Sequence, residues 1–107
     1  MDKKILSVMD KVIVLFGQML PPVQSQADGF TKVDDHPAVR DLKNRRRRTA
    51  DELHPTRAGY RDRAKSLTKL FVGGVNHHGQ KYGLALSHKK QWGQVVSLMH
   101  DLAEVTP

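Results

Sequence analysis

The residues best suited to chemistry in this sequence are four consecutive arginines, Arg45 to Arg48. Runs of arginine are typical of surfaces that meet phosphate groups, since each contact releases counterions and adds affinity. If the run is helical, consecutive side chains point about 100° apart, and the four cannot all face one partner. A second basic row follows on the next helix. The candidate phosphate-binding residues are Arg45, Arg46, Arg47, Arg48, Arg57, Arg61, Arg63 and Lys65.

The basic charge is concentrated in one segment. Of the 18 lysines and arginines and 11 acids in the 107 residues, eleven basic and four acidic residues lie between Arg40 and Lys69, so this segment carries the whole net charge of +7. A localised excess favours a surface that faces a polyanion, either DNA or RNA. Three alternatives remain for this segment: a solvated face that has no partner, a surface that binds an acidic protein, or a surface that meets a membrane. No zinc-finger spacing or aromatic RNA-binding pair is present, and sequence-specific recognition is not expected.

A second candidate site overlaps the basic segment. Residues 50–64 read ADELHPTRAGYRDRA. This block, from Asp51 to Tyr60 and at most from Val39 to Leu70, resembles the C-terminal Asp/His block of SGNH (GDSL-type) hydrolases. The resemblance implies that Asp51 orients the imidazole of His54, which would deprotonate a serine.

The rest of the chain does not match that family. None of the five serines follows Gly-Asp, and a triad base without its nucleophile performs no acyl transfer. Two interpretations stay open: an SGNH-like hydrolase or its non-catalytic fragment, and a helix end in which Asp51 and Glu52 close one helix before His54 and Pro55 turn the chain. The second is preferred, and enzymatic activity is not expected.

Metal and cofactor sites are not expected either. The chain has no cysteine, which excludes disulfides and thiolate ligands. His77, His78 and His88, or His100 with Glu104, would be the candidate ligands, but zinc sites need three or four well-placed ligands. Histidines in a polar loop are the simpler interpretation.

The N-terminal segment predicts an amphipathic helix over residues 3–20. Ile5, Met9, Val12 and Phe16 recur at the spacing of one buried face, and two prolines follow. The alternative is a weak secretion signal in residues 1–27. No stretch approaches the ~20 apolar residues that span a bilayer. The expected location is cytoplasmic.

The remaining pattern predicts a loop over residues 21–34, a basic helical region over 35–72, a loop over 73–86 that includes a long loop or small hairpin near 75–86, and a helix over 87–104. In the basic region, Asp35 would cap the first helix and Pro55 would end it. Gly73 and Gly74 would end the next helix, and Ser87 would cap the last one.

Apolar stripes on these helices require partners. The third helix carries Tyr60, Ala64, Leu67 and Phe71, and the last helix has the strongest stripe of the chain. Helices with one apolar face bury it against each other, so the sequence predicts a single domain of the mainly α class, a compact bundle of three or four helices.

The function hypothesis is therefore a small basic helical protein that binds nucleic acid through its phosphate backbone, or that belongs to a nucleoprotein assembly. The alternatives are the SGNH-like hydrolase or fragment, and a helical assembly protein that forms homo-oligomers.

Overall fold

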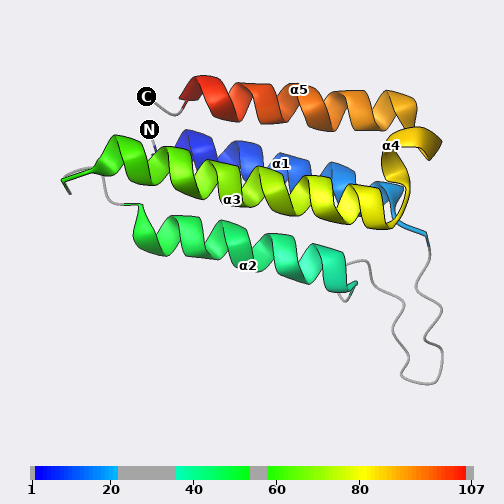
Figure 1. The fold of residues 1–107 in the computed structure, drawn as a ribbon, viewed down its shortest axis with the longest axis horizontal. Helices are drawn as coiled ribbons and strands as arrows, with labels where there is room; N and C mark the ends of the chain where they lie inside the picture. Colours follow the sequence, from blue (N-terminus) through cyan, green and yellow to red (C-terminus); the bar gives the residue numbers. More distant parts are fainter. Residues whose placement is uncertain (1, 22–35, 54–57, 106–107) are drawn as a thin grey trace.

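The structure, a computed structural model, describes residues 2–21, 36–53 and 58–105, and these fold into a helical bundle (Figure 1). The mainly α class predicted from the stripes is confirmed. The described residues form α1 (Asp2–Met19), α2 (Pro37–Glu52), α3 (Tyr60–Lys81), the single-turn α4 (Leu84–Ser87) and α5 (Lys89–Val105). No strand occurs among them.

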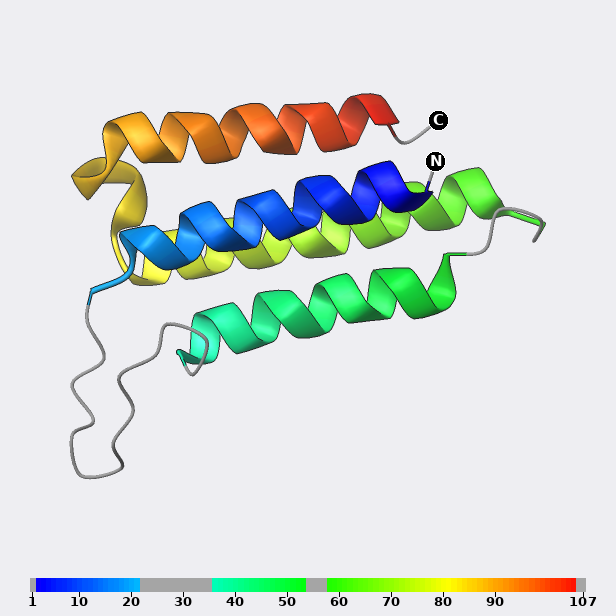
Figure 2. The same ribbon diagram turned by 180° about the vertical axis from the view of Figure 1, so that it is seen from behind.

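The four long helices lie along the bundle and alternate in direction from one to the next in the chain (Figure 1). Helices α1 and α3 lie between α2 and α5, with α3 on one side of the molecule and α1 on the other (Figures 1 and 2). Helix α1 packs against α2 and α5, and α2 also packs against α3, whereas α3 and α5 share fewer contacts. Two of the long helices are thus joined to α2, the helix that carries the arginine run.

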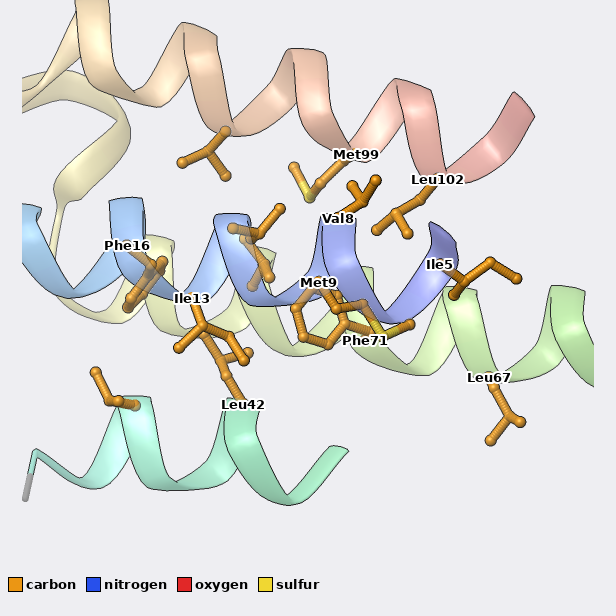
Figure 3. Packing of buried hydrophobic residues seen from close by; sticks show 14 of the residues in the cluster. Ile5, Val8, Met9, Ile13, Phe16, Leu42, Leu67, Phe71, Met99 and Leu102 are labelled. Atoms are coloured by element: carbon orange, nitrogen blue, oxygen red, sulfur yellow. The ribbon is translucent and has the colours of Figure 1, made fainter. Parts of the chain in front are cut away.

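The core is formed by the stripes that the sequence predicted. Ile5, Met9, Val12 and Phe16 of α1 are completely buried, which confirms the amphipathic helix. Figure 3 shows Val8 directed toward Met99 and Leu102 of α5. Each fully buried side chain of this size stabilises the fold by about 1.5–3 kcal/mol. No helix in the described residues is long and apolar enough to cross a membrane.

The sequence predicted that Asp35 caps the second helix and that Ser87 caps the last one, and the structure shows other residues at the described helix beginnings. His36 caps α2, because its Nδ1 accepts a hydrogen bond from the backbone N–H of Ala38 at 3.1 Å. Asp35, predicted as that cap, lies outside the described residues, as does most of the predicted loop 21–34. Ser87 does not cap the last helix: it ends α4, and α5 begins at Lys89.

The predicted loop or hairpin over residues 73–86 is wrong. Helix α3 continues through Gly73 and Gly74 to Lys81, and only Tyr82 and Gly83 separate it from α4. Gly83 has φ +66°, a backbone conformation that a side chain disfavours, so the turn is made there. The glycine pair lowers helix propensity but does not end the helix, because buried residues on both sides of it, such as Phe71 and Val75, hold α3 in the core.

Gly79 is needed for the contact between α3 and α5. A Cβ added at this position would lie 2.7 Å from Cζ3 of Trp92, closer than carbon atoms pack. At Gly73, in the same helix, a Cβ would meet nothing within 4 Å.

We expect Gly79→Ala and Gly73→Ala to change stability in opposite directions. Gly79→Ala should lower the free energy of unfolding by about 1–3 kcal/mol, because the indole ring must move. Gly73→Ala should raise it by up to about 1 kcal/mol through helix propensity alone. Urea denaturation followed by circular dichroism measures both, and equal changes would contradict the close contact.

Candidate nucleic-acid interface

The arginine run lies in the second half of α2, and each of its four side chains has a different environment. Arg45 faces α3. Its Nε donates to Asp41 Oδ2 at 2.8 Å, and its Nη1 donates to the carbonyl oxygen of Leu70 at 2.7 Å. A Cβ at Gly74 would lie 2.7 Å from Cδ and Nε of Arg45. Because Gly74 has no side chain, the guanidinium of Arg45 can occupy this space as it crosses α3.

Arg46 faces α1 instead. Its Nε and Nη2 donate to the two carboxylate oxygens of Asp10 at 3.0 and 3.2 Å. A paired contact of this geometry fixes orientation as well as charge. Both side chains are partly exposed, so the pair contributes at most about 1 kcal/mol. Arg46 thus helps to set how α1 and α2 meet.

Arg48 lies at the end of α2 that approaches the beginning of α3. It pairs with Glu52, whose other carboxylate oxygen accepts from Arg63 Nη1 of α3 at 3.4 Å. Two of the predicted phosphate-binding arginines therefore share one acid. Both remain exposed to solvent.

Arg47 points outward. It lies on the exposed face of α2 in one row with Arg40 and Lys43, at spacings of three and four residues, and all three side chains are exposed. Neither Arg40 nor Arg47 forms an ion pair with any described residue. The row spans about 10 Å of helix, at 1.5 Å per residue. We call Arg40, Lys43 and Arg47 the α2 row.

The α2 row was only partly identified from the sequence. Arg47 was a predicted contact, but Arg40 and Lys43 were counted in the basic segment without being assigned to a site. The signal that would have found them is their spacing relative to Arg47 on one helical face.

The other predicted contacts are not gathered at the α2 row. Arg61 and Lys65 are exposed on α3, and Arg57 lies outside the described residues. Asp51 is exposed near the end of α2, while its proposed partner His54 lies outside the described residues. The resemblance of this block to SGNH hydrolases stays a prediction.

A cluster of polar side chains between α2 and α3 was not expected from the sequence. His78 Nε2 lies 2.7 Å from the Asp41 carboxylate that also accepts from Arg45, and His78 Nδ1 is buried without a hydrogen-bond partner in the described part of the chain. His36 packs edge-on against Tyr82, with ring centroids 4.9 Å apart. Of the two histidines in the predicted loop, His78 thus belongs to a helix interface, whereas His77 is exposed.

The charges in this cluster shift two pKa values. Burial, with the nearby charges of His78 and Lys81, lowers the pKa of His36 below its usual 6.5. For Asp41, burial raises the pKa, but hydrogen bonds from His78 and Arg45 outweigh it, and the pKa falls below its usual 3.8. No group of three acids or histidines that could hold a metal ion occurs among the described residues.

Comparisons with known proteins add no assignment: no family model, no curated protein and no solved structure matches this chain.

Replacing Arg45 and Arg47 singly by glutamine should separate their roles in stability. Arg45→Gln removes hydrogen bonds to Asp41 and to the Leu70 carbonyl and should lower the free energy of unfolding by about 1–3 kcal/mol. Arg47→Gln should change it by less than about 0.5 kcal/mol, because the side chain is exposed. Urea titrations of both variants measure this, and equal losses would show that Arg45 has no special structural role.

Stability should fall on acidification in two steps. Because the pKa of His36 is lower in the folded chain, the unfolded chain takes up a proton first. The contribution of neutral His36 is complete above about pH 6.5 and is lost as the pH falls through the lowered pKa. The lowered pKa of Asp41 adds a second loss below about pH 3.8.

The variant His36→Asn isolates the first step, because asparagine caps a helix without titrating. Urea midpoints measured between about pH 7.5 and 5 should fall less steeply for this variant than for the unmodified chain. An unchanged slope would mean that His36 does not contribute to the pH dependence.

Proposed function

We propose that this protein binds nucleic acid through the phosphate backbone, alone or within a nucleoprotein assembly, and that the α2 row makes the central contacts. The observation that carries the proposal is the division of the arginine run. Arg45 and Arg46 are engaged with the neighbouring helices α3 and α1, whereas Arg47 joins Arg40 on an exposed face where neither pairs with a described residue.

The acids near α2 do not neutralise the positive charge of this row. Asp41 is engaged by Arg45 and His78, Asp10 by Arg46, and Glu52 by Arg48 and Arg63. Of the acids in α2, only Asp51 is exposed without an ion pair to a described residue. The outer face of the helix therefore keeps an excess of positive charge.

The chemistry of the row suits a phosphate backbone rather than base edges. Guanidinium groups donate in pairs to phosphate oxygens, and an array of such contacts gives affinity that is independent of sequence and falls with salt. Arg40 and Arg47 on this exposed face would each contact a phosphate, and phosphates lie about 3.4 Å apart along the helix axis of each DNA strand.

The binding experiment should spare the arginines that support the bundle. Neutralising Arg45 to Arg48 together would also remove the contacts to Asp41, Leu70 and Asp10. The better variant is Arg40→Gln/Arg47→Gln, with Arg61→Gln/Lys65→Gln as a control that removes the same charge from α3.

Fluorescence anisotropy with labelled single- and double-stranded DNA and RNA, over a salt series, measures the affinities. The α2 variant should weaken binding and reduce the slope of log K against log salt by about 2, one unit for each lost phosphate contact. The α3 control should retain most of the slope. Equal reductions in both variants would show that net charge alone governs binding, and no binding by the unmodified chain would refute the proposal.

A further inference from the structure

A groove lies between α3 and α5, on helices that do not include the α2 row. Its volume is about 620 Å³, within the range of ligand-binding sites. Its apolar surface includes Val72 of α3 and Val96 and Met99 of α5. Val72 and Val96 are only partly buried by the bundle.

The packing of α3 on α5 explains why the groove is open. Near α4, the ring of Trp92 fills the space beside Gly79 and closes the interface. Six residues earlier in α3, Gly73 lines the groove, and a Cβ there would meet no atom within 4 Å. The interface is thus closed at one end and unfilled farther along.

One polar atom beneath the surface of the groove lacks a partner among the described residues. The side chain of Thr68 lines the groove and is 6% exposed, and its hydroxyl oxygen has no hydrogen-bond partner in the described part of the chain.

The α3 edge of the groove is cationic. Lys69 lines it, and Lys65 and Arg61 continue the same row at four-residue spacing toward the beginning of the helix. All three are exposed, and none forms an ion pair with a described residue. We call Arg61, Lys65 and Lys69 the α3 row.

We propose that this groove binds an amphipathic helix of an acidic partner protein. The apolar stripe of that helix would lie on Val72, Val96 and Met99, and its Asp and Glu side chains would pair with the α3 row. This is the helix-in-groove mode of recognition, in which the partly exposed Val72 and Val96 would carry most of the apolar contact because Met99 is 9% exposed.

The combination of features favours this occupant over two others. A second copy of the chain would bring a net charge of +7 against the same sign. Nucleic acid would match the α3 row but not the apolar surface beside it. The inference is independent of phosphate binding by α2, and either proposal can fail without the other.

Two labelled helical peptides of about 18 residues test the proposal by fluorescence anisotropy. Both carry one leucine stripe, flanked by glutamates in the first and by lysines in the second. A third peptide contains the residues of the first in scrambled order, without the stripe.

Three variants accompany the peptides. Gly73→Leu fills the groove from a position where the backbone is helical and space is open. Lys65→Glu/Lys69→Glu reverses charge at two exposed positions of the α3 row. Arg40→Glu/Arg47→Glu makes the same charge change on α2 and serves as the control.

The expected result is binding of the glutamate peptide alone, weakened about tenfold or more by Gly73→Leu and by the α3 change but less than about threefold by the α2 control. Equal binding of the scrambled peptide, no binding of the glutamate peptide, or binding unaffected by Gly73→Leu would each overturn the proposal. A dimer in sedimentation that Gly73→Leu dissociates would assign the groove to a second copy and also overturn it.

Discussion

Consecutive residues of an α-helix point about 100° apart, and in α2 this rotation gives each arginine of the run a different neighbour. Arg45 reaches Asp41 and the backbone of α3, Arg46 reaches Asp10 of α1, and Arg48 shares Glu52 with Arg63. Of the four, only Arg47 is exposed and forms no ion pair with a described residue. The same four residues therefore contribute to the orientation of two neighbouring helices and to the charged surface. The arginine run cannot be understood as one binding patch, because its geometry assigns part of it to the bundle.

Much of the fold could be predicted from periodicity, because apolar stripes such as Ile5, Met9, Val12 and Phe16 identify buried faces without knowledge of the partners. The continuation of α3 past Gly73 could not. Glycine pairs commonly end helices, and here the decision depends on tertiary contacts: Gly74 accommodates Arg45, and Gly79 accommodates Trp92. The candidate site shows the same limit. The spacing of Arg45 to Arg48 indicates that they diverge, but which of them meets Asp10, 36 residues away, depends on how the helices pack.

The two proposed sites differ in chemistry and lie on different helices. The α2 row is cationic and lies on an edge helix, whereas the groove between α3 and α5 combines an apolar surface with the cationic α3 row. In Figure 1, α2 and α5 lie at opposite edges of the bundle. A phosphate backbone on α2 would leave the groove accessible to an acidic helix. The two proposed contacts use different helices, so neither excludes the other.

The central claim, that the arginine run is divided between structure and surface, is tested most directly by four single variants, in which each of Arg45, Arg46, Arg47 and Arg48 is replaced by glutamine. For each variant, the free energy of unfolding and the affinity for a labelled duplex should be measured in the same buffer. The account predicts a reciprocal pattern: Arg45→Gln loses stability and keeps most of its affinity, and Arg47→Gln loses affinity and keeps its stability. Four variants that lose stability and affinity in equal proportion would contradict it.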